Sequence, residues 1–213
     1  MGRTIEDFLE VSNLPPAAGT QEDIEAQPGY RELWPRGVRR PIVGFAAWSG
    51  TGKTTLLRRI IPRLCKQGVR LAVIKHAHHG FEIDIPGKDS YEVRHAGASQ
   101  VLVTSARRRA LIMERALEYD PCLEEEIEYL DQESIDLILV EGFRHARLPK
   151  IELRRRREQP GTGTPLAPED PCIIAIATDF PEIPDRTLPV FDLNDIESIV
   201  QFILNAIMGR GSA

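Results

Sequence analysis

The sequence has few cysteines, no excess of basic residues and no long hydrophobic run. Its three cysteines, Cys65, Cys122 and Cys172, stand far apart in 213 residues, so their spacing predicts neither a disulfide framework nor a zinc ribbon and suits a reducing cytoplasm. Lys plus Arg number 27 against 32 for Asp plus Glu, and this net charge of -5 lacks the basic footprint of nucleic-acid-binding proteins. No apolar run could cross a bilayer, and no secretory signal opens the chain. We therefore expect a cytoplasmic protein with neither a membrane nor a nucleic-acid partner.

What the sequence does contain indicates one folded domain behind an extension. Hydrophobic residues make up 42% and charged residues 28% of the chain, which is typical of a folded protein. Breakers at 14–19 and 27–29 interrupt residues 1–40, which lack a long apolar period. We expect residues 1–40 to be a partly flexible extension with a short helix around 5–11, and residues 41–210 to form the domain.

A strand–turn–helix–strand pattern opens this domain. The apolar run 42–47 predicts a buried strand, a glycine-rich turn follows, and a helix over 53–67 is ended by Gly68 before a strand at 69–74. This βαβ unit predicts a parallel sheet with helices on its faces. Other stretches predict strands at 135–140, 150–153 and 172–177, a hairpin from 100–104 and 110–114, and helices at 89–97, 121–130 (capped by Asp120) and 196–207 (capped by Asn194).

The turn of the βαβ unit carries the clearest chemical motif. Residues 47–54 read A-W-S-G-T-G-K-T and match the phosphate-binding P-loop pattern G-x-x-x-x-G-K-[ST] except at Ala47. The glycines let successive backbone N–H groups face phosphate oxygens, Lys53 would bridge the β- and γ-phosphates, and the Thr54 hydroxyl would ligate Mg²⁺. We therefore predict an α/β fold of the P-loop NTPase type, with a mostly parallel central sheet flanked by helices plus a β-hairpin excursion. The predicted phosphate-binding residues are Ser49, Gly50, Thr51, Gly52, Lys53, Thr54 and Thr55.

A P-loop needs a second acid for the metal, usually at the end of a neighbouring apolar strand. Glu141 fills that place because it directly follows the apolar residues 137–140; the alternative is a strand-end carboxylate that faces solvent. Asp136 precedes the same residues and is a poorer candidate, since ligands gather at the carboxyl ends of such sheets.

Four stretches in order carry a more specific signature: the P-loop at 45–55, I-K-H-A-H-H at 74–79, D-I-P-G-K-D-S-Y at 84–91 and L-V-E-G-F at 139–143. Together they resemble the MobB family of molybdopterin-guanine dinucleotide biosynthesis adapter proteins, over about residues 41–208. The resemblance implies a GTP- and Mg²⁺-binding protein that is at most a slow GTPase. It also implies assistance to a partner guanylyltransferase, MobA, which attaches GMP to molybdopterin, and it makes molybdopterin a further candidate ligand. Family members are dimers, and we expect the contact at the hairpin 100–114.

Polar residues outside the P-loop are further candidates. A second polar loop, formed by Gly87, Lys88, Asp89 and Ser90, could present N–H groups and a hydroxyl to an anion, or Asp89 to a metal shell; the alternative is a simple cap and turn. Asp84 stands where a switch-type metal contact could lie.

The residue that would select guanine is less evident, because the N-K-x-D motif of small GTPases is absent. Asp179, after the strand at 172–177, could accept hydrogen bonds from guanine N1 and N2, which adenine lacks; a turn or helix cap is the alternative.

Two clusters are left without an assigned role. The spacing of His76, His78 and His79 argues against a zinc site, because His76 and His78 would share one face of a strand while His79 points away and no cysteine is near. We expect these residues to line the phosphate, pterin or partner site or to form a polar loop. The arginines at 154–157 are a phosphate-binding lid, a patch for an anionic partner or a solvated charge run.

Two other functions compete with the adapter. A small P-loop kinase would use the arginines as a lid and Glu141 or Asp89 to orient an acceptor hydroxyl. A regulatory GTPase switch is the other alternative, but the sequence lacks the motif with which such switches recognise guanine. No water-activating glutamine or arginine finger is evident, so slow hydrolysis is expected.

Overall fold

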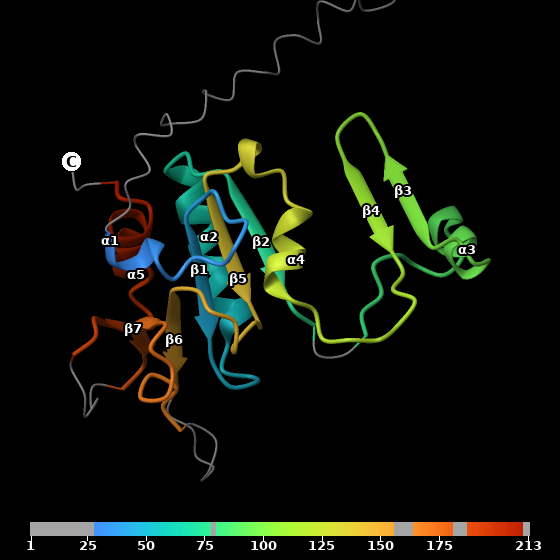
Figure 1. Cartoon of the computed structure of the whole chain (residues 1–213). Coiled ribbons are helices and arrows are strands. Elements are labelled where there is room, and N and C mark those ends of the chain that lie inside the picture. Colours follow the sequence, from blue (N-terminus) through green and yellow to red (C-terminus); the bar gives the residue numbers. More distant parts are fainter. Residues whose placement is uncertain (1–27, 78–79, 156–163, 181–186, 211–213) are drawn as a thin grey trace, which may run out of the picture. The chain divides into compact units, whose positions relative to one another are not determined.

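The computed structural model describes residues 28–77, 80–155, 164–180 and 187–210 (Figure 1). The helix expected around residues 5–11 lies outside these ranges. The chain divides into two compact units, one containing residues 1–76 and 122–213 and the other residues 77–121.

The first unit is built on a six-stranded parallel sheet, as the sequence predicts. Its strands are β1 (Ile42–Ala46), β2 (Leu71–Lys75), β5 (Leu137–Glu141), β6 (Lys150–Arg154), β7 (Ile173–Thr178) and β8 (Val190–Asp192). They lie in the order β2-β5-β1-β6-β7-β8, and all pairs are parallel. The sheet confirms the α/β fold class. The short edge strand β8 was not expected.

Both faces of the sheet are covered, and the central strands show it residue by residue. Along β5, Leu137 and Leu139 belong to one hydrophobic cluster, whereas Ile138 and Val140 belong to the other. Successive side chains of a strand point to opposite faces, so a strand buried on both faces has no polar alternation. This explains the continuous apolar run in the sequence.

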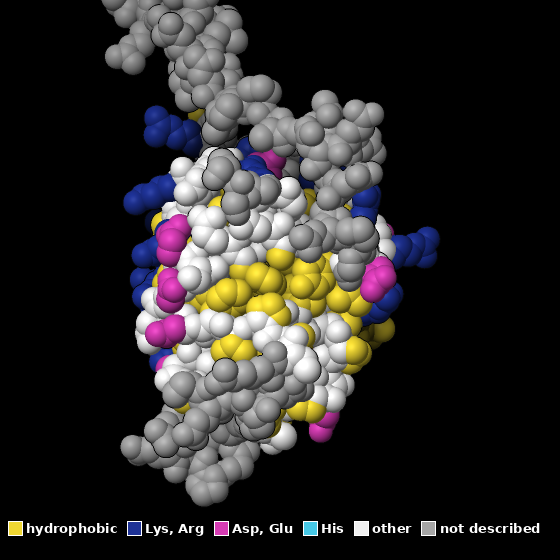
Figure 2. All heavy atoms as spheres, turned by 90° about the vertical axis from the view of Figure 1, so that its left-hand side faces the viewer, with side chains coloured by type: hydrophobic (Ala, Val, Ile, Leu, Met, Phe, Trp, Pro, Cys, Tyr) yellow, Lys and Arg dark blue, Asp and Glu magenta, His cyan; other side chains and the backbone are white. Residues whose placement is uncertain are grey.

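Helices α2 (Lys53–Lys66) and α5 (Ile196–Phe202) pack on one face, and α4 (Leu123–Glu128) packs on the other. Shorter helices are α1 (Pro28–Arg31) and the 3₁₀ turn η3 (Gln132–Ser134). Figure 2 shows hydrophobic side chains gathered in a band on the face of the core that carries α5 and β7. In the part of the chain that the structure describes, no helix combines the length and the apolar character needed to span a membrane.

Two helix caps differ from those expected. Helix α5 is capped by Asp195, whose carboxylate accepts from Ser198 N, and not by Asn194. Helix α4 begins two residues later than expected, at Leu123 instead of Pro121, and its N-cap is Cys122 instead of Asp120. The apolar spacing of the C-terminal helix is confirmed, although its last part, Ile203–Ile207, has π-helical hydrogen bonding.

Residues 30–40 contact the core directly. Tyr30 and Leu33 pack against the cluster under α2 and α5, and Trp34 packs against the cluster on the opposite face. Gln132 fixes the end of the segment, because its side chain accepts from Arg39 N at 2.7 Å and donates to a backbone carbonyl of the same segment at 3.0 Å. The described part of the expected extension is therefore part of the first unit's packing.

The second unit contains α3 (Asp89–His95) and the antiparallel pair β3 (Gln100–Thr104) and β4 (Arg109–Met113). The pair confirms the predicted hairpin. Arg94 organises the unit: its guanidinium forms ion pairs with Glu82 and Asp84 at 2.7 Å and with Glu114 at 2.9 Å. Hydrogen bonds to these carboxylates, led by Asp84, raise the pKa of Arg94.

Candidate nucleotide and metal site

The predicted P-loop forms the turn between β1 and α2. Gly50 and Gly52 have φ values of 70° and 102°, in the left-handed region that glycine adopts without strain. Thr51 is buried, and its hydroxyl donates to Trp48 O at 2.8 Å, which closes the turn. Ala47 replaces the first glycine of the motif without positive φ and is buried. A small side chain therefore satisfies this position.

Lys53 begins α2 and folds back over the loop. Its Nζ donates to Ala47 O at 3.1 Å and to Trp48 O at 3.3 Å, so the ammonium lies above the turn. The first backbone N–H groups of the 14-residue helix α2 lie at the same place. An ammonium and a helix N-terminus together favour a phosphate anion. Ser49 and Thr55, the other predicted residues, are exposed at the loop and in the first turn.

The predicted metal pair is brought together. Thr54 Oγ1 donates to Glu141 Oε1 at 2.8 Å, and Glu141 is only 7% exposed at the end of β5. The register explains the contact, because β5 pairs directly with β1 and Glu141 lies opposite Phe45, just before the loop. A hydroxyl and a carboxylate oxygen at this spacing are the kind of donors that Mg²⁺ prefers, so the residues present fit the ion. Asp136, the poorer candidate, lies at the other end of β5 and pairs with Arg70.

Lys75 is a site residue that sequence reasoning did not single out. It is the last residue of β2, and its Nζ lies 3.5 Å from Thr54 Oγ1 and 3.9 Å from Glu141 Oε2. Its place at the end of an apolar strand is the signal that could have found it, because ligands gather at the carboxyl ends of parallel strands.

The backbone after Glu141 packs tightly on the end of β2. His76 N donates to Glu141 O at 2.8 Å, and the rings of His76 and Phe143 lie 5.1 Å apart. Gly142 has a φ of 100°, and a Cβ on it would lie 2.8 Å from His76 O. Only glycine fits here. His78 and His79 lie outside the described residues.

On the other side of the loop, two arginines approach from neighbouring segments. The Arg144 guanidinium lies 4.6 Å from the centre of the Trp48 ring, and Trp48 Nε1 donates to Thr164 O at 3.0 Å. Arg155 follows β6, and a Cβ on Gly52 would lie 3.5 Å from its Nε. The described part of the arginine run therefore includes a cation beside the P-loop; residues 156 and 157 lie outside the described ranges.

Arg155 also connects the loop to the predicted base-reading residue. Its Nη1 lies 3.9 Å from Asp179 Oδ2. Asp179 directly follows β7, two strands from β1 in the sheet. The carboxyl ends of β1, β6 and β7 thus bring together the P-loop, Arg155 and Asp179 along one edge.

A buried carboxylate fixes the segment that contacts Trp48. Glu152, on β6, is 2% exposed and accepts from Leu166 N at 2.8 Å and from Ala167 N at 2.9 Å. Its third partner is the Arg154 guanidinium at 2.8 Å. Arg154 is therefore a structural residue, whereas Arg155 faces the loop.

The other predicted residues belong to the second unit. Asp84 is engaged with Arg94, as described above. Gly87, Lys88 and Asp89 are exposed, Ser90 is partly buried, and Gly87 N donates to Glu92 Oε1 at 3.1 Å, which is the contact of a cap and turn. Their roles toward nucleotide or metal stay predictions.

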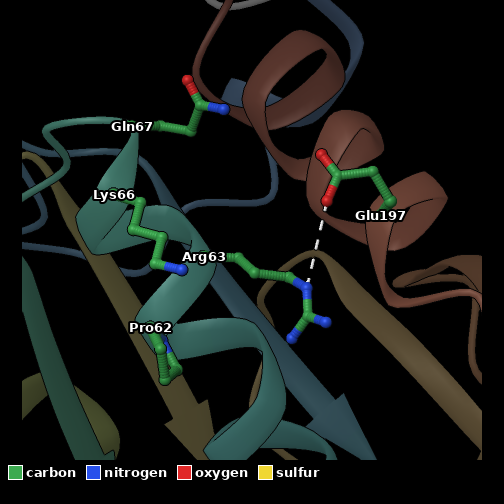
Figure 3. A pocket seen from close by; sticks show the side chains of 5 residues that line it. All are labelled: Pro62, Arg63, Lys66, Gln67 and Glu197. Atoms are coloured by element: carbon green, nitrogen blue, oxygen red, sulfur yellow. Dashed lines mark ion pairs between the residues drawn. The ribbon is translucent and has the colours of Figure 1, made fainter.

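A separate polar pocket of about 300 Å³ lies at the opposite end of α2 (Figure 3). Its lining is Pro62, Arg63, Lys66, Gln67 and Glu197. Arg63 and Glu197 face each other across it, 3.9 Å apart. None of the predicted phosphate- or metal-binding residues lines it.

The comparisons with known proteins agree on one family. The family model described as molybdopterin guanine dinucleotide synthesis protein B, MobB, matches residues 42–179. A relative in Escherichia coli, named molybdopterin-guanine dinucleotide biosynthesis adapter protein, is 45% identical over 168 residues, which are 77% of this chain and 91% of that protein. A relative of the same name in Haemophilus influenzae is 39% identical over 165 residues, covering 78% and 88%. The crystal structure of Bacillus subtilis MobB has a TM-score of 0.60 at 29% identity and covers 79% of this chain and 99% of that one. This chain therefore belongs to the MobB family.

Proposed function

We propose that this protein binds GTP with Mg²⁺ at its P-loop and acts as an adapter in the biosynthesis of molybdopterin guanine dinucleotide. Family membership supports the biosynthetic role, since the relatives in Escherichia coli and Haemophilus influenzae are named for it. One observation carries the nucleotide-binding role: Thr54 and Glu141, from different elements, meet beneath a P-loop whose lysine and helix N-terminus face the same space.

In this proposal each group has a defined task. Lys53 and the loop N–H groups hold the triphosphate, and Thr54 and Glu141 hold Mg²⁺, which neutralises phosphate charge. Arg155 supplies a further cation beside Gly52. Slow hydrolysis is expected, because Gly142 has no side chain and Phe143 is apolar, so neither residue after Glu141 can orient an attacking water as a glutamine would.

Asp179 would read the base. A carboxylate accepts from guanine N1 and N2, whereas adenine offers no donor at those positions. The sheet order supports this role, because Asp179 lies at the same edge as the P-loop and is linked to it by Arg155. A base over β7 would place the phosphate chain across β6 toward β1.

The proposed partner is a guanylyltransferase of the MobA type, which joins GMP to molybdopterin, and the proposed assembly is a homodimer. One face of the hairpin carries Leu102, Leu111 and Met113, which are 58%, 50% and 41% exposed. Leu102 and Leu111 lie directly opposite each other in register. An apolar strip of this kind on a two-stranded sheet suits contact with a second copy.

The deciding experiment is calorimetric titration with GTP and with ATP, each in the presence of Mg²⁺. We expect GTP to bind more tightly and Lys53→Ala to abolish binding, whereas Lys66→Ala, at the far end of α2, should bind as the unchanged protein does. The rate at which the partner guanylyltransferase forms molybdopterin guanine dinucleotide should then rise when this protein is added. Equal or stronger binding of ATP, together with acceptor-dependent phosphoryl transfer, would instead indicate a small P-loop kinase.

A further inference from the structure

Lys75 occupies the place where the proposed metal ligands meet. The residue ends β2 and lies opposite Glu141 in the parallel pairing of β2 with β5. Its ammonium is 3.5 Å from Thr54 Oγ1 and 3.9 Å from Glu141 Oε2. Three elements, β2, β5 and α2, therefore direct a cation and two oxygen ligands to one point.

The charges at this point define two alternatives for the same oxygens. Glu141 is buried, and a buried carboxylate needs a cation or hydrogen bonds near it. Lys75 supplies the cation here. A divalent ion bound between Thr54 and Glu141 would repel the Lys75 ammonium at such a distance. The divalent ion and the ammonium therefore cannot contact these oxygens at the same time.

Lys75 can leave this position easily. Its side chain is 54% exposed, whereas that of Glu141 is 9% exposed. A lysine head is a compact, strongly hydrated charge on a flexible stem of four carbons, so it can swing between nearby anions. The ion pair is therefore movable on the lysine side and fixed on the glutamate side.

With a nucleotide bound, the anion to receive it would be the end of the phosphate chain. In P-loop proteins the metal bridges the β- and γ-phosphates, so a group beside the metal ligands is also beside those phosphates. The sheet order agrees: Asp179 follows β7 on one side of β1, and Lys75 lies on the other side, beyond β5. A nucleotide with its base at Asp179 would have its terminal phosphate toward Lys75.

We propose that Lys75 holds Thr54 and Glu141 in the nucleotide-free protein and turns to the terminal phosphate of a nucleoside triphosphate when Mg²⁺ takes its place. This inference rests on the proposed nucleotide site. It makes Lys75 the residue that distinguishes a triphosphate from a diphosphate, since a diphosphate lacks the γ-phosphate that would receive the displaced ammonium.

The test compares Lys75→Gln, which removes the charge, with Lys75→Arg, which keeps it, and with Lys66→Gln as the control at the far end of α2. Each protein is titrated calorimetrically with GTP and with GDP in the presence of Mg²⁺. We expect Lys75→Gln to weaken GTP binding by roughly tenfold or more, as for loss of a hydrogen bond to a charged group. GDP binding should not weaken, because GDP lacks the γ-phosphate and the competing ammonium is gone from the metal ligands. Lys75→Arg should retain most of the preference for GTP, and the control should retain all of it.

A second measurement examines the empty site. Mn²⁺ alone should bind Lys75→Gln more tightly than the unchanged protein, because the competing ammonium is gone. Binding is measured as the loss of the electron paramagnetic resonance signal of free Mn²⁺. Unchanged or weaker Mn²⁺ binding would overturn the role of Lys75 in the nucleotide-free protein.

The two proposals can fail separately. If the unchanged protein binds GTP and loses it in Lys53→Ala, but Lys75→Gln leaves the ratio of GTP to GDP affinity unchanged, the role of Lys75 is wrong and the proposed function stands. An equal loss of GTP and GDP affinity would also overturn it, because a merely structural partner of Glu141 would act on both. If the unchanged protein binds neither nucleotide, both proposals fail.

Discussion

The hydroxyl of Thr54 donates a 2.8 Å hydrogen bond to Glu141 Oε1, which joins the first turn of α2 to the end of β5. The two residues are 87 positions apart in the chain, and only the parallel pairing of β1 with β5 brings them together. Because Glu141 is buried while Thr54 is exposed, the carboxylate is the fixed member of the pair. This arrangement suits a site in which the protein holds its metal ligands before the ion arrives.

Glu141→Gln tests this arrangement by keeping the size of the side chain and removing its charge. We expect binding of GTP in Mg²⁺ to weaken by roughly 10–100-fold, the range for a disturbed metal shell, while binding in EDTA is unchanged. Calorimetry with and without Mg²⁺ measures both values. Glu133→Gln, an exposed carboxylate outside the site, is the matched control. An unchanged effect of Mg²⁺ on GTP binding in Glu141→Gln would exclude Glu141 from the metal site.

Asp179→Asn tests the choice of base. The amide keeps one acceptor but presents a donor to guanine, so the preference for GTP over ATP should fall by roughly tenfold, as for loss of a charged hydrogen bond. Competition titrations with the two nucleotides measure the ratio. Asp192→Asn, at the end of the neighbouring strand β8, should leave the ratio unchanged. Equal loss of GTP and ATP affinity in Asp179→Asn would mean that Asp179 acts through Arg155 on the phosphates and does not read the base.

The sequence predicted the parts of this site that are encoded locally. The P-loop lies in one stretch of nine residues, and its strand and helix follow from apolar periodicity on either side. Glu141 was predictable because the end of an apolar strand is a fixed location in a parallel sheet. The same logic ranked Asp136 as the poorer candidate, and in the structure Asp136 pairs with Arg70.

Other parts depend on information that no local pattern holds. Lys75 reaches Thr54 only because β2 pairs with β5 in a particular register, and the pairing partner of a strand cannot be read from its own residues. The contact of Arg155 with the loop likewise depends on the order β1-β6-β7. The cap of α5 was misplaced by one residue because Asn194 and Asp195 are equally good caps, and only packing decides between them. The edge strand β8 was missed because three residues give no period.

Gly142→Ala should destabilise the fold more than another glycine substitution at a similar backbone angle. Gly68, the control, has a φ of 73° with open space around it, so Gly68→Ala should cost about 1–2 kcal/mol for left-handed backbone alone. At Gly142 the new Cβ would also meet His76 O at 2.8 Å, and the backbone must shift. Urea unfolding of both variants measures the difference. Equal free energies of unfolding would show that the close approach to His76 carries no cost.

Asp136 predicts an acid-dependent contribution to stability. Burial by itself would raise the pKa of Asp136, but hydrogen bonds from the Arg70 side chain and backbone N–H outweigh it and lower the pKa below its usual value. A lowered folded-state pKa stabilises the protein above the unfolded value, which is about 3.9, and this contribution disappears as pH falls through the folded value. Asp136→Asn should therefore lose about 1–3 kcal/mol at neutral pH, as for hydrogen bonds to a charged group, and show a flatter decline below about pH 4. Unfolding measured across pH 2–7, on a grid spaced by about one unit, compares the two proteins. Parallel curves would contradict the assignment.

Leu111→Glu tests whether the hairpin joins two copies of the chain. Leu111 is half exposed and lies opposite Leu102 in the register of β3 and β4, so it stands within the apolar strip and not at its rim. A glutamate at the centre of an apolar contact loses its hydration without gaining a partner, which disfavours the pair of copies strongly. Sedimentation should therefore show a dimer for the unchanged protein and a monomer for Leu111→Glu, with the nucleotide affinity of the monomer retained. Leu117→Glu is the control, because Leu117 is 78% exposed and lies outside both strands. A dimer that persists in Leu111→Glu would place the contact elsewhere, since two like charges brought together at the strip would add repulsion to the loss of hydration.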